Sequence, residues 1–432
     1  MPTLPATTVD FFLAGLEAFM VRSGQGMHWG VTQLWLAGRP DAAALQSAWE
    51  QMHAQQPLLG ARLRRQWRGW RLAWETSGPI PAPPIIWHPP QPLPPDDGVL
   101  QERLQGRTPA GGLTSPLLLE VFPWGDGGAH RVLLTWRHAL MDGTGVNLLL
   151  TRLAGGGGGD AGPPPVVVPP REGLGRLFKK ARPLLRRMHT MTLDGCLSAW
   201  SKGAPQAGAP AFRLIELTLE QSHAAVMRLR ETCGDFMQMP FYAAIAARAL
   251  RRLHERRGWH SPVLHLHLPC QVRGRSREHL FGNHMGALPL FLDAGALGTP
   301  DQAIKHVLEQ YREALKQGMA QASEALMALS THLPVTWFMP VVRWTNRGQI
   351  CSLFHSHTGT FLAGCTTFAG AAVQNVVTIP SVSTPPGLGI FFSDFAGRIT
   401  VTLAWREGGV TAAEEKLLCG QILTDLTGAS AA

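Results

Sequence analysis

The chain has 432 residues, 45% of them hydrophobic and 16% charged, so it is long enough for two domains and too apolar to be disordered. Its net charge of +9 suits an anionic partner, but it contains no zinc-finger spacing and no RNA-binding signature, so nucleic acid is not expected. The six cysteines form no CxxC pair, which argues against a disulfide framework or a structural zinc site. We therefore expect a cytoplasmic protein with no signal peptide and no membrane span.

The first half of the chain alternates strand and helix patterns. In chain order we expect a strand at 28–37, a helix from Asp41 to Pro57, a hairpin at 61–75, a strand at 131–136 and a helix at 145–153. The strand at 131–136 leads directly into Arg137 and His138, and a short loop separates it from the following helix.

A glycine-rich and then proline-rich stretch at residues 155–170 divides the chain, because it favours neither a helix nor a paired strand. We predict a first unit at residues 1–154, a linker and basic crossover segment at 155–210, and a second unit at 211–432.

The second unit repeats the mixture of elements. We expect strands at 212–218, 262–268, 386–394 and 398–405, and helices at 219–232, 240–257, 301–320 and from Ala412 onward. Helices and strands mix throughout, so the predicted class is α/β, with two mixed sheets flanked by helices.

The most informative segment is the strand end at residues 133–143, where His138 is followed four residues later by Asp142 and then by Gly143. A strand end is a rigid place to hold a catalytic base, and a glycine suits a tight turn. This H-A-L-M-D-G sequence resembles the HxxxDG motif of the chloramphenicol-acetyltransferase-like superfamily, which includes BAHD acyltransferases, wax ester synthases, alcohol acetyltransferases and condensation domains.

Three further segments resemble patterns of that superfamily. Residues 268–277 with the Phe-Gly-Asn at 281–283 are similar to its Asp-x-Arg-x-Arg and Gly-Asn pattern, although Gln271 or Val272 stands at the aspartate position. Residues 57–62 and 386–399 match the segment after the first helix and the paired late strands. Two departures leave the subfamily open: the BAHD motif D-F-G-W-G is absent, and Arg137 stands where many members have a second histidine.

The resemblance implies two chloramphenicol-acetyltransferase-like halves with an active-site channel between them. It also implies that His138 takes the proton of the acceptor as the acceptor attacks a thioester carbonyl. Asp142 is then expected to point away from the reaction and to pair with Arg273, or alternatively Arg275, so that the pair holds the loop. Gly143 is expected to let the backbone turn and to leave room for the acyl chain.

Three further residues are candidates for binding substrate or the developing oxyanion. Asn283 is one, and its alternative role is to hold a turn. Ser356 and Thr358 are the others, since related chains place a strand near the active site at this point. The histidine pairs 265/267 and 355/357 have metal-ligand spacing, but no third ligand is evident and packed strand histidines are the favoured interpretation. We expect neither a metal nor a redox cofactor.

Residues 171–189 hold seven Lys or Arg and a single acidic residue, interleaved with leucines and one phenylalanine. Three interpretations stay open: contact with an anionic membrane, docking of an acidic carrier protein, and a linker helix with a solvated basic face.

The predicted function is transfer of an acyl group from a thioester, with acyl-CoA preferred over an acyl carrier protein, to an alcohol or an amine. The alternatives are a stand-alone condensation enzyme with a carrier-protein donor and a non-catalytic docking module. A hydrolase is disfavoured because no G-x-S-x-G segment is present.

Overall fold

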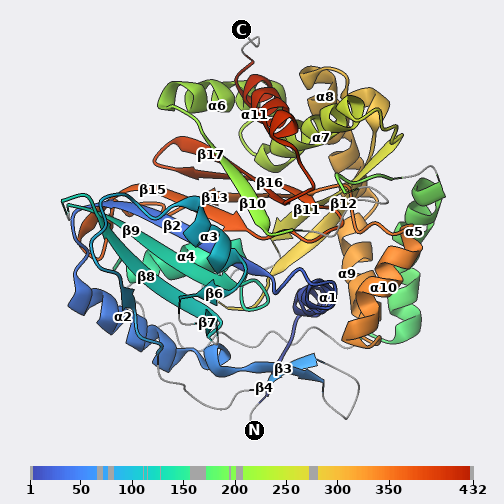
Figure 1. Ribbon diagram of the computed structural model, residues 1–432. Helices are drawn as coiled ribbons and strands as arrows, with labels where there is room; N and C mark the ends of the chain where they lie inside the picture. The colour runs from blue at the N-terminus through green and yellow to red at the C-terminus, as the bar shows by residue number, and fades with distance from the viewer. Residues whose placement is uncertain are drawn as a thin grey trace.

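The computed structural model describes residues 3–65, 72–75, 82–109, 111–113, 115–126, 128–155, 172–193, 196–200, 208–271 and 281–428. The predicted linker lies outside these residues apart from Gly155, and so do Arg273 and Arg275. The described elements mix helices with two larger sheets, which confirms the α/β class (Figure 1).

The bounds of the described elements are as follows. The helices are α1 Thr8–Arg22, α2 Ala42–Gln55, α3 Asp97–Leu104, α4 Gly143–Leu153, α5 Leu174–Leu193, α6 Leu219–Cys233, α7 Gln238–Arg256, α8 Pro300–Lys316, α9 Met319–Ser330, α10 Val335–Thr345 and α11 Ala412–Thr427, with short 3-10 turns η1 Pro57–Gly60 and η2 Ala294–Leu297. The strands are β1 Thr3–Pro5, β2 Trp29–Ala37, β3 Arg62–Arg65, β4 Leu72–Glu75, β5 Ile86–Trp87, β6 Arg107–Thr108, β7 Gly111–Gly112, β8 Leu117–Trp124, β9 Ala129–Arg137, β10 Pro210–Glu216, β11 Val263–Gln271, β12 Met285–Asp293, β13 Phe354–Thr360, β14 Thr367–Phe368, β15 Ala371–Pro380, β16 Leu388–Phe395 and β17 Arg398–Arg406.

The first large sheet has six strands in the order β14-β15-β2-β9-β8-β5. Its centre, β2 beside β9, is antiparallel, with Trp29 opposite Arg137. The strands β14 and β15 belong to the second half of the sequence, and β15 pairs with β2 from Ala372↔Ala37 to Pro380↔Gly30. The late segment therefore crosses over to extend the sheet formed by the first half, and Figure 1 shows β15 beside β2.

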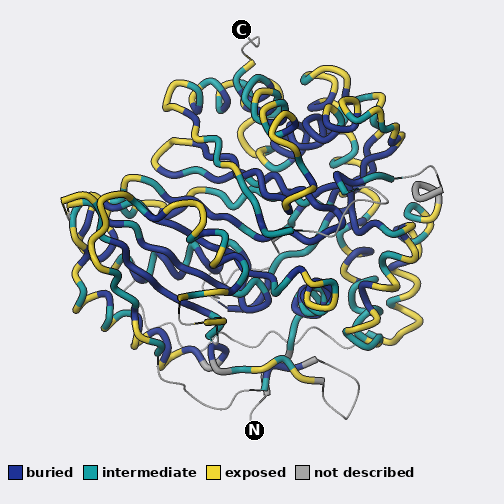
Figure 2. The backbone as a smooth tube through the Cα atoms, in the orientation of Figure 1, coloured by how far each residue is buried: buried dark blue, intermediate teal, exposed yellow. Residues whose placement is uncertain are grey.

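The second large sheet has the order β10-β17-β16-β13, with β13 parallel to β16 and the other neighbours antiparallel. The strands β11 and β12 pair separately. Helices α6, α7, α8 and α11 gather over this part of the molecule in Figure 1. The core contains two large apolar clusters, one of which joins residues of both halves of the chain, and Figure 2 shows the buried backbone concentrated in the strands and in α7.

Several helices begin close to the positions predicted from the sequence, and each of these starts with a side-chain cap. Asp41 caps α2 through bonds from the backbone N–H groups of Ala43 and Ala44, and Thr218, Thr299 and Thr411 each form a capping box. One prediction was wrong: the single helix expected at 301–320 is two helices. Gly318 adopts a left-handed φ of 66° between α8 and α9, a conformation that glycine reaches without steric cost.

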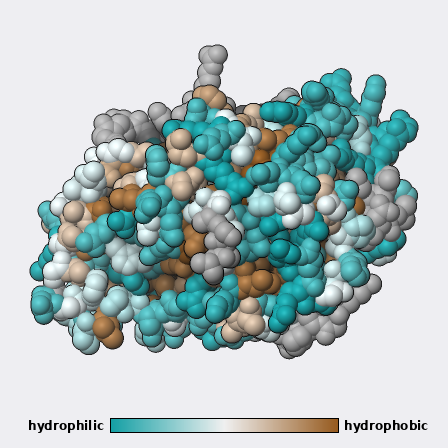
Figure 3. All heavy atoms as spheres, turned by 90° about the horizontal axis from the view of Figure 1, so that it is seen from above, coloured by the Kyte–Doolittle hydropathy of each residue, from teal (hydrophilic) through white to brown (hydrophobic). Residues whose placement is uncertain are grey.

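The surface is mixed rather than uniformly apolar. On the face drawn in Figure 3, hydrophobic side chains show as small separate areas among hydrophilic ones. None of the helices in the described ranges combines the length and the apolar composition needed to cross a bilayer.

Candidate active site

His138 follows directly on β9, a strand whose buried Val132, Leu133 and Leu134 fix it in the first sheet. The backbone N–H of His138 donates to the carbonyl of His28 at 2.9 Å, which continues the β2–β9 ladder by one residue. The two imidazole rings lie 4.7 Å apart, tilted by 32°. The histidine is thus held by its backbone at the end of a central strand.

The turn after His138 delivers Asp142 to the N-terminus of α4. Its carboxylate accepts a hydrogen bond from the backbone N–H of Gly145 at 2.9 Å, which caps the helix. The second carboxylate oxygen accepts from the backbone N–H of His284, also at 2.9 Å. Asp142 is 3% exposed, so a single buried carboxylate joins the turn to a segment from the second half of the chain.

That segment, residues 281–284, lies across the turn. The N–H of Gly282 donates to the carbonyl of Leu140 at 2.7 Å, and Met141 and Gly282 form a parallel bridge. The Phe-Gly-Asn residues singled out from the sequence therefore contact the HxxxDG turn directly. The predicted ion pair of Asp142 with Arg273 stays a prediction, because Arg273 lies outside the described residues.

Asn283 is buried and holds this junction together. Its side-chain nitrogen donates to the carboxylate of Asp10 at 3.0 Å and to the carbonyl of Ala139 at 3.1 Å, which engages both of its N–H groups. The hydroxyl of Thr7 donates to the carbonyl of Asn283 at 3.1 Å. These contacts support the turn-holding alternative for Asn283 over the donation of an N–H to an oxyanion.

Burial lowers the pKa of His138, since an enclosed imidazole is costly to charge. Its own backbone, the charge of Asp142 and the Asn283 side chain oppose that effect to a smaller extent. The Nδ1 atom is buried, and among the described residues it has no partner at good hydrogen-bond geometry. A neutral imidazole at pH 7 is the state that a general base requires.

The lowered pKa predicts the pH dependence of catalysis. The kcat/KM should stay level above about pH 7 and fall on acidification along one limb, because protonated His138 cannot accept a proton. The midpoint of that limb is expected below the ordinary histidine value of 6.5. A pH profile of kcat/KM measures it, and a midpoint above 6.5 assigned to His138 contradicts the lowered pKa of this imidazole.

Gly143 lies against β13 of the second sheet. A Cβ placed on Gly143 would stand 3.0 Å from the Cγ2 of Thr358, closer than side chains ordinarily approach. This contact brings Thr358 to the HxxxDG turn, as the resemblance implied. The Thr358 hydroxyl itself donates to the carbonyl of Phe392 at 3.3 Å.

Because of this close approach, we expect Gly143→Ala to lower stability and activity, and we expect a second substitution at Thr358 to restore part of both. The added methyl must displace Thr358, so we expect about 1–3 kcal/mol of destabilisation and a matching loss of activity. Thr358→Ser removes Cγ2, so the double variant Gly143→Ala, Thr358→Ser should recover much of the loss. A double-mutant cycle of unfolding free energies measures the coupling. Additive effects would show that the two positions do not touch.

Arg137, which stands where many members of the superfamily have a second histidine, pairs with Glu17 of α1. Its Nε donates to one carboxylate oxygen at 2.9 Å and a terminal nitrogen donates to the other. Glu17 is 6% exposed, so this bidentate pair ties α1 to the end of β9. The arginine therefore helps to position the strand end beside His138.

The histidine pairs at 265/267 and 355/357 are packed side chains. His265 stacks on Phe291 with ring centroids 4.5 Å apart, and burial lowers the pKa of His267 to about 4. His357 lies 4.8 Å from the ring of Tyr242. Within the described ranges, no three His, Cys, Asp or Glu side chains gather in a way that could hold a metal ion.

Two residues of this site were missed by sequence reasoning. His28 lies 110 positions before His138, and only the β2–β9 register brings them together. Asp10 lies in α1, a helix that was not predicted, and it receives bonds from Asn283 and from the indole of Trp74 at 3.3 Å. An HxxxDG pattern carries no signal for either residue.

Solved structures with the same fold cover nearly the whole chain. The TRI3 trichothecene 15-O-acetyltransferase from Fusarium sporotrichioides has a TM-score of 0.72 at 13% identity, over 98% of this chain and 95% of that one. The first condensation domain of the CDA synthetase has a TM-score of 0.65 at 17% identity, over 100% and 97%. Polyketide synthase associated protein 5 from Mycobacterium tuberculosis has 0.60 at 16%, over 99% and 97%.

No family model matches the sequence, and none of the curated proteins matches it. Over nearly its whole length the chain has the same fold as this acetyltransferase and this condensation domain. The expected fold class is thereby confirmed, while the low identities leave the reaction to be argued from the site.

Proposed function

We propose that this protein is an acyltransferase that moves an acyl group from a thioester to an alcohol or an amine, with His138 as general base. The observation that carries the proposal is the position of His138. Its half-buried imidazole, with Nδ1 enclosed, stands at the end of a central strand, on a turn clamped by Asp142 and by residues 281–284 of the other half. The shared fold with acyltransferases and condensation domains supports the same reaction class.

The proposed chemistry uses Nε2 of His138, the ring nitrogen other than the enclosed Nδ1. Because Nδ1 of His138 is enclosed, Nε2 is the atom that accepts the proton from the acceptor O–H or N–H as the acceptor attacks the thioester carbonyl. The carbon–sulfur bond of the resulting tetrahedral intermediate then breaks, and His138 returns the proton to the departing thiolate. Asp142, with its oxygens on Gly145 and His284, acts by holding the turn. The reaction requires neither a metal nor a redox cofactor.

Ser356 is our candidate for the hydroxyl that binds the oxyanion. It precedes Thr358, which meets Gly143, by two residues on β13, and it is half-buried. No hydrogen bond of its hydroxyl to another described residue is found, whereas the Thr358 hydroxyl donates to the carbonyl of Phe392.

Ser356→Ala is expected to lower kcat by about 10–10³-fold with little change in KM. Steady-state kinetics beside Thr358→Ser as control test this, and an unchanged kcat would remove Ser356 from the mechanism.

The reaction class is tested by release of free thiol. A panel of acyl-CoA donors of increasing chain length is mixed with alcohols and amines, and acceptor-dependent thiol release is followed. Release confirms transfer from acyl-CoA and identifies the chain length. If only acylated carrier proteins serve as donor, the alternative of a condensation enzyme is correct. Failure with both donor types would favour a non-catalytic docking role.

The free state of the cysteine thiols supports a reducing compartment. All six are free, and Cys351 is fully enclosed, with a pKa raised by burial. Free buried thiols persist in reducing surroundings, and we propose that the protein works in the cytoplasm.

A further inference from the structure

Helix α10 exposes a row of large apolar side chains. Trp337 is 65% exposed, Val341 36% and Trp344 82%. Their spacing of four and then three residues places all three on one side of the helix. Exposed tryptophans are unusual on a protein surface that faces only water, and here two occur within a single 11-residue helix.

The opposite side of α10 is firmly packed, so the exposed row does not reflect a loosely held helix. Phe338 and Met339 are buried in a cluster with Phe11, Leu16 and Met20 of α1. The ring of Phe338 lies 5.2 Å from that of Phe11 in an edge-to-face contact. The tryptophan row is therefore presented outward by a helix that α1 anchors.

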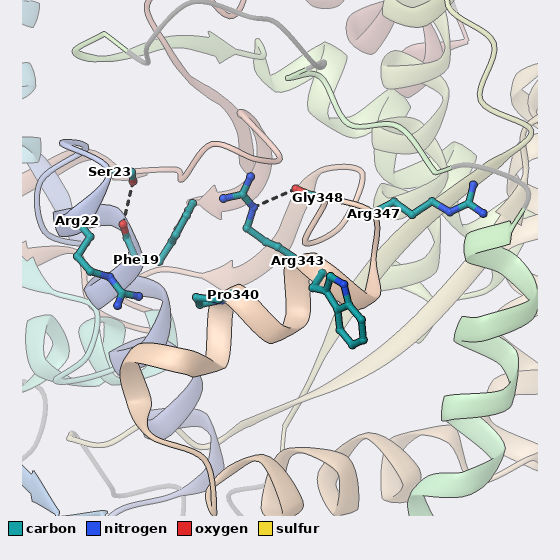
Figure 4. A pocket seen from close by; sticks show the side chains of 8 residues that line it. Phe19, Arg22, Ser23, Pro340, Arg343, Arg347 and Gly348 are labelled. Carbon is teal, nitrogen blue, oxygen red and sulfur yellow. Dashed lines mark hydrogen bonds between the residues drawn. The ribbon is translucent and has the colours of Figure 1, made fainter.

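Three arginines lie beside the exposed row, next to Trp344. Arg22, Arg343 and Arg347 line a hollow of about 890 Å³ where the end of α1 meets α10, together with Phe19 and Trp344. Figure 4 shows the arginine side chains spread along the hollow beside α10. Arg22 donates to the carbonyl of Thr336 at 2.6 Å, and Arg343 to that of Gly348 at 3.1 Å.

The charged side chains that line the hollow are all basic. Among the described residues, none of these three arginines forms an ion pair with a carboxylate. The sequence contains no Asp or Glu between Glu324 and Asp394, a stretch that includes all of α10. An approaching anionic surface would meet no repulsion from this element.

The basic helix α5 adds to the same side of the molecule. It packs on α9 through the buried Ala181 and Leu184, and it leaves Leu174 and Phe178 each 56% exposed among lysines and arginines. Figure 1 draws α5, α9 and α10 together at the right-hand side. The predicted membrane or carrier-protein contacts of residues 171–189 remain predictions.

We propose that the outward face of α10, with Trp337, Val341 and Trp344 at its centre and Arg22, Arg343 and Arg347 beside it, binds the surface of an anionic lipid bilayer. Tryptophan rings favour the boundary between headgroups and acyl chains, and arginines form hydrogen-bonded ion pairs with lipid phosphates. A bilayer offers an apolar zone directly beneath a layer of phosphates, which matches the row of tryptophans with arginines beside it. The interaction is independent of His138 and of the acyl transfer proposed above.

The test is co-sedimentation of the full-length protein with vesicles. Phosphatidylcholine vesicles are compared with vesicles that also contain phosphatidylglycerol, at low and at high salt. We expect binding to the anionic vesicles at low salt and its loss at high salt, because screening weakens the attraction. The variant Trp337→Ser, Trp344→Ser should bind about tenfold or more weakly, and Arg22→Glu, Arg347→Glu should lose the preference for anionic lipid.

Phe236→Ser is the matched control, since Phe236 is 95% exposed but lies just before α7. It should bind vesicles as the unaltered protein does. Thermal unfolding of every variant shows whether the fold is retained. The proposal is overturned if the unaltered protein stays in the supernatant with anionic vesicles, or if the folded tryptophan variant binds as well as Phe236→Ser does.

Discussion

His138→Ala should lower kcat/KM for acyl transfer by about 10²–10⁴-fold, the usual contribution of a general base. The loss is expected because no other imidazole can take its place. The neighbouring His28 ring is 4.7 Å away, but its Nε2 is engaged with the carbonyl of Ser381 at 3.1 Å, and burial holds its pKa well below the ordinary value. Initial rates of acceptor-dependent thiol release measure the effect.

A buried histidine elsewhere serves as the control for this variant. His53 is 2% exposed in α2 and bonds to the carbonyl of Trp49 at 2.9 Å, so His53→Ala removes a comparable side chain away from the turn. Its rate should stay within a few-fold of the unaltered protein once stability is accounted for. A folded His138→Ala variant that keeps full activity would exclude the proposed mechanism.

Asp142→Ala is expected to lower the unfolding free energy by about 2–5 kcal/mol, and to affect stability more than chemistry. Two effects combine: the lost cap of α4 costs about 0.5–2 kcal/mol, and the part-buried N–H of His284 loses a charged acceptor worth about 1.5–3 kcal/mol. Denaturant unfolding followed by circular dichroism measures this change. The residual rate per folded molecule should exceed that of His138→Ala.

Asp41→Ala is the matched comparison, because the Asp41 carboxylate caps α2 at an exposed position through Ala43 and Ala44, and only its backbone N–H, which the substitution keeps, bonds a second segment at Ala369. Its cost should be that of a cap alone, about 1 kcal/mol. Equal costs at Asp41 and Asp142 would show that the bond to His284 adds nothing. An Asp142→Ala enzyme of normal stability but without activity would mean that Asp142 takes part in the reaction.

Local sequence patterns predicted many of the secondary-structure elements. The alternating strand at 28–37, the Asp41-capped helix and the hairpin at 61–75 correspond to β2, α2 and the β3–β4 pair, whose register runs from Arg62↔Glu75. These elements combine a clear hydrophobic period with a cap or a turn of known preference. Their existence therefore follows from short-range chemistry.

Other elements carry weak local signals and were missed. Helix α1 is apolar on most sides because it packs against α10 as well as against the strand end, so it shows little amphipathic period. Helix α10 carries an internal Pro340 and two exposed tryptophans, a pattern unlike that of an ordinary surface helix. Neither was predicted, and both matter to the proposals.

The sequence by itself determined the α/β class, most of the strongly periodic elements and the one turn on which the chemistry is proposed, because each depends on residues close together in the chain. The tertiary structure decided what surrounds that turn. The β2–β9 register brings His28 to His138, the crossing of residues 281–284 puts Asp142 against His284, and β13 brings Thr358 to Gly143. These contacts join residues more than 100 positions apart, and no local pattern encodes such pairings because they arise from strand register and from the packing of one half on the other.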